Sequence, residues 1–536
     1  MPRLSLKPVT LSSLCLAGLL TQIACAQNSL LPQAQDDTWY DDGAAAVAMA
    51  TGKTINNTPG AARNIILFIG DGMGVSTVSA ARIFAGQQLG MTGEEYQLSF
   101  EKFPWTGLSK TYNTDAQVGD SAGTATAFMT GVKSRSGVIN ISSEPARGSC
   151  AEFMSADNAV LLSALEIAEL AGKATGVVST ARITHATPAT SYANSPDRDW
   201  ESDADLPQEA IARGCKDIAS QLLAFKPRLE AKINNGNPLA VIDGIDVVFG
   251  GGRRAFYSAD PASLVGFAET AGAGRREDGR NLIQEWQDMG GVYVMDQAGF
   301  EAISDLETRN IMGLFESSHM RYEANRPEDK NGEPSLTEMT TKAISLLQQD
   351  ADGFFLQVEA GRVDHAHHAN NAYNALSDAV ELSRAVEAAL AMVDLEETLI
   401  IVTADHSHVF TFAGYPDRGN PILGTAGNDI LGNPYTTVGY YNGRGFNDSG
   451  DETDADTRAG LSLPGRNNLS GIDTTAPGFH QESLVALGSE THGGEDVGIY
   501  AIGPGAHLLS GTIEQNVIFH VMNHAGALVQ QAADRR

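Results

Sequence analysis

Short apolar runs that each lead into acidic residues place the strongest constraint on the fold of this chain. The run NIILFIG, residues 64–70, leads into Asp71; FFLQVEAG contains Glu359; and TLIIVTADHSH contains Asp405 and His406. Such short runs, rich in β-branched and aromatic residues, are typical of parallel strands buried on both faces. Between the last two runs, apolar residues recur at helical spacing, at Leu376, Val380, Val386, Leu390 and Val393. We therefore expect a doubly wound α/β fold, with a central, mostly parallel β-sheet flanked by helices on both faces.

Ligands of doubly wound sheets bind beyond the carboxyl ends of the strands, so three strands that deliver acids there predict a functional site. The length of 536 residues suits one large α/β domain with an insertion, or two domains. Residues 410–490 are dense in Gly, Pro, Asn and Asp and are interpreted as an inserted, loop-rich subdomain. Within it, DETDADTRAG lacks the glycine and the closing glutamate of a calcium loop and is interpreted as a solvated acidic loop.

The stretch GRVDHAHHANN, residues 361–371, holds one acid and three histidines within five positions. On a helix that starts near Asp364, the i and i+4 positions share a face, which pairs Asp364 with His368. His367 is also within reach at i+3, whereas His365 points elsewhere, and spacing alone does not choose between His367 and His368. A carboxylate and an imidazole on adjacent turns suit Zn²⁺. A single histidine is more often structural, but five of the twelve histidines fall between 365 and 408, at predicted strand ends, and this favours a metal site.

Three further stretches contribute candidate residues. GDGMG holds Asp71 between glycines, and Val75 stands where a dinucleotide fingerprint needs its third glycine. In GDSAGTATAFMTGV, Ser121 is either a plain N-cap or a nucleophile at a helix N-terminus, where the macrodipole favours negative charge. THATPATSYANSPDRDW offers His185, Thr187 and Arg198, and an arginine can grip an oxyanion with two parallel hydrogen bonds.

The N-terminal residues MPRLSLKPVTLSSLCLAGLLTQIACA, 1–26, have the basic start, short apolar run and Ala-Cys-Ala site of a secretory signal. After its removal two cysteines remain, Cys150 and Cys215, and we expect them to form a disulfide rather than two separate buried thiols. The C-terminus shows no lipid-anchor signal. The protein is thus expected to be periplasmic or secreted.

Acidic residues dominate the charge: 36 Lys and Arg stand against 66 Asp and Glu, a net charge of −30. Loss of Arg3 and Lys7 with the signal leaves 34 basic residues against 66 acidic ones, or −32. This balance argues against a surface for nucleic acids or anionic membranes. A solvated acidic surface is the simple interpretation; adaptation to high salt is a further hypothesis.

Taken in order, several long motifs resemble the alkaline phosphatase family. They are NIILFIGDGMGVSTVSAARIF, GDSAGTATAFMTGVK, THATPATSYANSPDRDWESDADLP, IMGLFESSHMRYE, VEAGRVDHAHH, VTADHSHVFTFAGYP and ETHGGEDVGIYAIGPGAHL. The resemblance covers nearly all of residues 27–536, the expected catalytic domain. It implies a sheet between helices, a homodimer, and hydrolysis of a broad range of phosphate monoesters at two Zn²⁺ ions and one Mg²⁺. The segment 410–490 would correspond to the crown subdomain of animal members.

The resemblance also assigns roles to residues. Ser121 resembles the nucleophile and Arg198 the phosphate clamp. It implies one zinc on Asp364, His368 and His492, and a second zinc on Asp71, Asp405 and His406. It implies magnesium on Asp71, Thr187 and Glu359.

Two positions distinguish branches of the family. His185 and His365 stand where the enterobacterial branch has an acid and a lysine, so the chain resembles the animal and marine-bacterial branch; both would border the site. Phe315 and Glu316 match part of an additional Ca²⁺ site of animal members, which could equally take Mg²⁺. The cysteine pair also resembles a disulfide of those members.

Related enzymes and a non-enzyme are the alternatives. A sulfatase would carry a Cys- or Ser-x-Pro-x-Arg motif, which Ser121-Ala122-Gly123 lacks. A nucleotide phosphodiesterase would typically have a threonine nucleophile and no third metal. The combination of nucleophile, clamp and ligands argues against an acidic secreted protein that only binds metal or phosphate.

Overall fold

The structure is a computed structural model of the chain, and it describes residues 45, 47, 52–157, 159–234, 236–258, 274–303, 310–329, 332–445 and 468–535. Residues Met1–Ile55 form one unit and Asn56–Arg536 a second, and all features below belong to the second. The expected signal, 1–26, and the acidic loop 451–460 lie outside the described residues. Among the helices that are described, none combines the length and apolar character needed to cross a bilayer.

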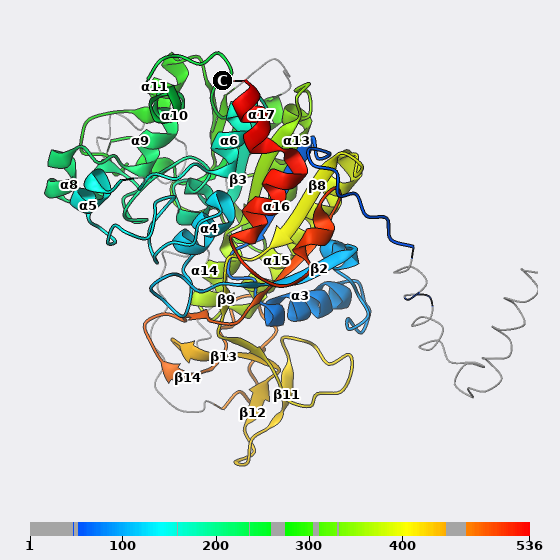
Figure 1. Ribbon diagram of the computed structural model, residues 1–536. Helices are drawn as coiled ribbons and strands as arrows, with labels where there is room; N and C mark the ends of the chain where they lie inside the picture. The colour runs from blue at the N-terminus through cyan, green and yellow to red at the C-terminus, as the bar shows by residue number, and fades with distance from the viewer. Residues whose placement is uncertain are drawn as a thin grey trace, which may run out of the picture. The chain divides into compact units, whose positions relative to one another are not determined.

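A ten-stranded sheet, shown with its helices in Figure 1, organises the second unit. All of its described strands run parallel except β16, which is antiparallel to both β8 and β2. The mostly parallel α/β fold expected from the sequence is therefore confirmed. The strand order is β17 (Gly511–Glu514), β2 (Trp105–Lys110), β16 (Val497–Ile502), β8 (Thr398–Thr403), β1 (Asn64–Gly70), β7 (Phe354–Ala360), β3 (Ala174–Arg182), β4 (Val247–Gly251), β6 (Ile311–Leu314) and β5 (Val292–Val294).

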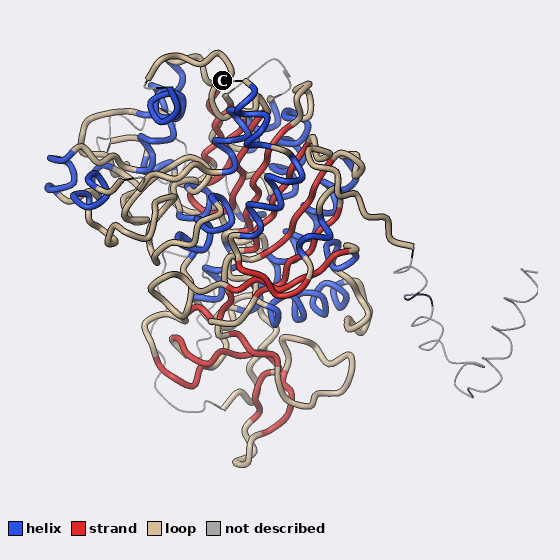
Figure 2. The backbone as a smooth tube through the Cα atoms, in the orientation of Figure 1, coloured by secondary structure: helices blue, strands red, loops and turns tan. Residues whose placement is uncertain are grey.

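Two hydrophobic cores lie on opposite faces of this sheet, because side chains alternate along each strand. On β1, Ile65, Leu67 and Ile69 belong to one core, and Ile66 and Phe68 belong to the other. Figure 2 shows helices on both sides of the strands. The first core takes residues from α4 (Ser121–Thr130), α6 (Ala164–Leu170), α16 (Val517–Gly526) and α17 (Leu528–Asp534); the second takes them from α3 (Val75–Gln88), α13 (Leu336–Leu347) and α15 (Ala372–Met392).

Helix α15 forms where the apolar stripe predicts it. Asn371 caps its N-terminus by accepting a hydrogen bond from the Asn374 backbone N–H at 3.0 Å. Leu376, Val380 and Val386 are buried in the second core, and the helix ends just before Val393. The strand–helix–strand unit from β7 to β8 therefore follows directly from hydrophobic periodicity.

Between β8 and β16 the chain leaves the main sheet. It forms a three-stranded sheet of β10 (Phe410–Phe412), β13 (Val438–Gly443) and β14 (Ser483–Ala486), and a hairpin of β11 (Thr425–Asn428) and β12 (Pro434–Thr436). A separate antiparallel pair of strands joins β9 (Ser407–His408) to β15 (His492–Gly493). In Figure 1, β11 to β14 are grouped beyond the sheet edge at which α14 (Arg362–His368) and β9 lie. These short strands and their connections account for the loop-rich composition of residues 410–490.

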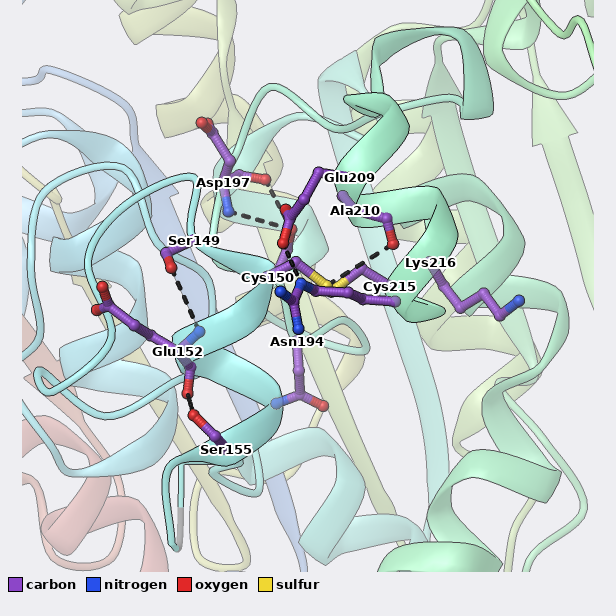
Figure 3. The surroundings of a disulfide bond; sticks show 12 residues. Ser149, Cys150, Glu152, Ser155, Asn194, Asp197, Glu209, Ala210, Cys215 and Lys216 are labelled. Atoms are coloured by element: carbon purple, nitrogen blue, oxygen red, sulfur yellow. Dashed lines mark hydrogen bonds and ion pairs between the residues drawn. A yellow bond between two sulfur atoms is a disulfide. The ribbon is translucent and has the colours of Figure 1, made fainter.

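The disulfide expected between Cys150 and Cys215 is present, with an S–S distance of 2.06 Å. Its surroundings are drawn in Figure 3. Both cysteines are buried, in a small apolar cluster with Trp200 and Leu206. Both cysteines lie outside the main sheet, and in the sequence Cys150 precedes and Cys215 follows the loop that carries Arg198.

Candidate active site and metal centres

Three neighbouring strands bring the predicted acids to one edge of the sheet. In the order β8–β1–β7, Ile69 pairs with Thr403 on one side and with Glu359 on the other, so the three strands end level. Asp71 follows β1 directly and Asp405 follows β8 after one residue. The adjacent carboxyl ends of parallel strands therefore position these side chains together, as the sequence predicts.

A first group of metal-ligand type consists of Asp364, His368, His408 and His492. Asp364 Oδ1 lies 3.4 Å from Nε2 of both His368 and His492, and those two imidazole nitrogens are 3.1 Å apart. Asp364 and His368 occupy i and i+4 positions of α14, on one face. Burial lowers the pKa of His492 to about 3, so its imidazole is neutral, the form that binds metals.

The structure also decides which histidine of the Asp364 stretch joins this group. His367 is fully buried and faces other elements: its Nε2 lies 3.0 Å from Thr77 Oγ1, and its Nδ1 lies 2.8 Å from the Tyr440 hydroxyl. His367 is therefore a satisfied structural histidine, and His368 is the residue placed at the site.

His408 is the member of this group to which the sequence analysis assigned no role. Its Nε2 lies 2.8 Å from Asp364 Oδ1, and its Nδ1 lies 2.6 Å from Oε2 of the buried Glu490. Burial alone would lower the pKa of His408, but the two carboxylates outweigh burial and raise it to about 10. The spacing of the histidines could have indicated this role. His408 follows His406 by two positions, and alternate residues of an extended segment lie on the same side.

A second group consists of Asp71, Asp405 and His406, all fully buried. His406 Nε2 lies 3.3 Å from Asp71 Oδ1 and 3.5 Å from Asp405 Oδ2. Ser121 joins them, with its Oγ 3.1 Å from His406 Nε2 and 3.5 Å from Asp71 Oδ1. Burial, reinforced by Asp405, Asp364 and other acids, raises the pKa of Asp71 well above its ordinary value. A divalent cation would relieve this crowding of carboxylates.

A third group shares Asp71 with the second and adds His185 and Glu359. Burial and the nearby Asp405 raise the pKa of Glu359 to about 7, although Ser179 donates a hydrogen bond to it. Thr187 lies in the short helix α7 (Ala186–Ala189), and its hydroxyl is buried. His185 is thus placed with the carboxylates and not only at the border of the site.

The metal-ion interpretation can be tested on buried atoms that have no hydrogen-bond partner in the structure. Five such atoms lie at the second and third groups, and all are oxygens or imidazole nitrogens, the donor types that divalent cations take. Buried polar atoms are rarely left unpaired. The donor sets therefore fit bound cations. The five atoms are Asp71 Oδ2, Asp405 Oδ2, Glu359 Oε1, Thr187 Oγ1 and His185 Nδ1.

Helix α4 begins at Ser121, and its N-cap is Asp120, not the serine. The Asp120 carboxylate accepts hydrogen bonds from the backbone N–H groups of Ala122 at 3.3 Å and Gly123 at 3.1 Å. Because Asp120 does the capping, the Ser121 hydroxyl is free to face His406 at the positive end of the helix. The plain N-cap interpretation of Ser121 is therefore wrong.

Arg198 lies beside this helix start. Its Nη1 donates to Asp120 Oδ2 at 3.2 Å, and its Nη2 lies 2.9 Å from His185 Nε2. The guanidinium is thus held between two partners, and the side chain as a whole is 17% exposed. Such an arginine next to Ser121 can bind the oxygens of an anion.

Two other predictions fall outside these groups. His365 packs its ring against His319 and His185, with centroid distances of 3.9 and 5.3 Å. Phe315 is buried, and within the described part of the chain Glu316 belongs to no group of three or more acids, histidines and cysteines that could share a cation. Burial raises the pKa of Glu316, with a contribution from Asp329, and it does the same to Glu333 with a contribution from Glu316. These acids lie close enough to influence one another.

Comparison with known proteins gives concordant results. A family model described as alkaline phosphatase matches residues 62–528. The tissue-nonspecific alkaline phosphatase of Homo sapiens is 41% identical over 513 residues, covering 94% of this chain and 91% of that protein. An alkaline phosphatase of Gadus morhua is 42% identical over 475 residues, covering 88% and 92%. A solved alkaline phosphatase from Thermus thermophilus is 24% identical, with a TM-score of 0.59 over 90% of this chain and 98% of that one. This last likeness concerns the fold alone.

Proposed function

Because the chain belongs to the alkaline phosphatase family and is a phosphomonoesterase, we propose that it hydrolyses its substrates through a phosphoserine formed on Ser121. The observation that carries the proposal is the position of the Ser121 hydroxyl. It lies 3.1 Å from His406 at the N-terminus of α4, within reach of Asp71 and beside Arg198. A buried serine that is relieved of capping and faced by a ligand cluster is suited to act as a nucleophile.

We further propose two Zn²⁺ ions and one Mg²⁺ as cofactors. Asp364, His368 and His492 would hold one zinc ion, with His408 orienting Asp364. When bound, such ions lower the pKa of an oxygen ligand and neutralise charge that builds up on attacking and leaving oxygens. The other assignments are the second zinc ion on Asp71, Asp405 and His406, and magnesium on Asp71, Thr187 and Glu359, with His185 adjacent.

The residues of the chain would act in two displacements. First, Ser121 Oγ bonds to phosphorus as the ester P–O bond breaks and the alcohol leaves. Water then attacks the phosphoserine and releases inorganic phosphate, returning the serine. Throughout, Arg198 binds the non-bridging oxygens, and Asp120 and His185 hold its guanidinium in place. The positive end of α4 favours negative charge at Ser121.

Export, assembly and a fourth cation complete the proposal. We propose that residues 1–26 are a secretory signal, that 27–536 form the catalytic domain with 410–490 as its inserted subdomain, and that the enzyme is a periplasmic or secreted homodimer. The disulfide supports an oxidising compartment. An additional Ca²⁺ or Mg²⁺ would bind at Phe315 and Glu316, near Glu333. The partners are small phosphate monoesters, and the net charge of −30 argues against nucleic acid.

Hydrolysis of a phosphate monoester with a chiral, isotopically labelled phosphorus tests the mechanism. Two in-line displacements give net retention, whereas direct attack by water gives inversion. We expect retention, and phosphate transfer to amino-alcohols such as Tris. Ser121→Ala should lose about a thousandfold in rate or more, with some metal-driven hydrolysis left. Ser155→Ala, on an exposed helical serine whose hydroxyl donates to the Glu152 carbonyl and not to a residue of the site, is the matched control and should stay active. Inversion, or an unimpaired Ser121→Ala, would remove Ser121 from the mechanism.

A further inference from the structure

The loop that carries Arg198 is held by a second segment, residues 137–150. Ile139 and Ser195 exchange backbone hydrogen bonds of 2.9 Å in both directions. The Gly148 N–H donates to the Pro196 carbonyl at 2.8 Å, and the Arg198 N–H donates to the Gly137 carbonyl at 2.9 Å. The backbone on the N-terminal side of the clamp is therefore positioned by this segment and not by the main sheet.

One side chain of this segment grips the acids on both sides of Arg198. Arg147 donates to Asp197 Oδ1 from Nε at 3.1 Å and from Nη2 at 2.9 Å, and its Nη2 lies 2.6 Å from Asp199 Oδ2. Its stem also packs on Gly137, where an added Cβ would come within 2.4 Å of Arg147 Cδ. Arg147 therefore contacts both neighbours of Arg198 and the residue that accepts its backbone hydrogen bond.

The disulfide anchors the same segment. Cys150 follows Arg147 by three residues, and Asp197 is among the residues that surround the bridge in Figure 3. The disulfide therefore fixes the C-terminal end of residues 137–150 covalently. Arg147, close to that end, holds residues 197–199 through its hydrogen bonds to Asp197 and Asp199.

We propose that Arg147 is a positioning residue for the phosphate clamp Arg198, an inference that rests on the proposed role of Arg198. Two physical effects act in the same direction. An anion clamp binds well only if its guanidinium is preorganised, so releasing residues 197–199 weakens phosphate binding. Arg147 also neutralises Asp197 and Asp199, which would otherwise compete with phosphate for Arg198.

The experiment measures the inhibition constant of inorganic phosphate for the metal-loaded enzyme. Arg147→Gln should raise it about threefold, the scale of an exposed ion-pair network. The matched control is Arg213→Gln, because Arg213 is similarly exposed, at 52% against 42%, and its ion pair beside the bridge is with Glu209 and not with Asp197 or Asp199. The control should leave the constant unchanged, and Arg147→Lys, which keeps the charge but not the fork, should fall between Arg147→Gln and the wild type.

A double-mutant cycle separates positioning from a general structural effect. If Arg147 acts through Arg198, Arg147→Gln should change the constant little in an Arg198→Ala background. An unchanged constant in Arg147→Gln, a rise as large in Arg213→Gln, or the same factor in both backgrounds would overturn the inference while leaving the clamp role intact. An unchanged constant in Arg198→Ala alone would instead overturn the clamp role, and the inference with it.

Discussion

Removal of the disulfide by the double substitution Cys150→Ala and Cys215→Ala should lower the free energy of unfolding by about 4 kcal/mol. The bridge joins residues 65 apart, and closing a loop of that size restricts the unfolded chain by about this amount in the chain-entropy description. Alanine suits the site, because both cysteines lie in an apolar cluster with Trp200 and Leu206. The substitution therefore introduces no unpaired polar group.

Denaturant unfolding of wild type and variant measures the difference. Zinc and magnesium must be held at fixed concentration, because ions that bind only the folded state add to its stability. A reductant is the control: it should bring the wild type to the stability of the variant and leave the variant unchanged. Thiol titration of the denatured wild type should find no free thiol in the processed protein, and two in protein that retains Cys15 and Cys25.

Two outcomes would refute this reasoning. Two free thiols in the processed wild type would show that the bridge does not form in solution. A loss of stability below about 1 kcal/mol with the bridge intact would show that the unfolded chain is already restricted by other contacts.

Three further predictions concern metals, salt and pH. Chelators should abolish activity, and zinc with magnesium should restore it. Asp71→Ala should lose more activity and more bound metal than Thr187→Ala, because Asp71 belongs to two ligand groups. Equal, mild losses in the two variants would contradict the ligand assignment. Because the net charge is −30, the melting temperature should rise from dilute buffer to molar salt as self-repulsion is screened, and a flat or falling profile would exclude a salt-adapted surface. Burial alone would raise the pKa of Glu201, but its ion pair with Arg182 lowers it from 4.5 to about 2. This pair should contribute about 3 kcal/mol of stability above pH 4.5, and that contribution is lost as the pH falls towards 2. The free energy of unfolding, measured from neutral pH to pH 2, should be lower for Glu201→Gln than for the wild type at neutral pH and should fall less steeply in acid. Parallel pH profiles of the two proteins would contradict the pairing.

Much of the fold could be predicted because its signals are local. The strands β1, β7 and β8 are short apolar runs, and α15 is an apolar stripe; each pattern depends only on residues close in sequence. The acids at the strand ends could be expected to converge because parallel strands share a carboxyl edge. The small sheets between residues 410 and 486 had no comparable signal, since their strands are short and pair across long, irregular connections.

The residues of the site divide in the same way. That Asp364 and a histidine three or four residues later share a face follows from helix geometry alone. The choice of His368 over His367 depends on which way α14 is turned, and only Thr77 and Tyr440, far away in sequence, decide that. The resemblance to a known family reached the same residue by another route.

By itself, the sequence determined the chemistry available to this protein: acids at strand ends, histidines beside them, and a serine and an arginine to act on a phosphate. Only the tertiary structure decided how these groups are used. Ser121 faces His406, His408 links Asp364 to Glu490, and Arg147 holds the neighbours of Arg198. The physical reason is that each of these roles is a contact between residues distant in sequence, and no local pattern encodes such a contact.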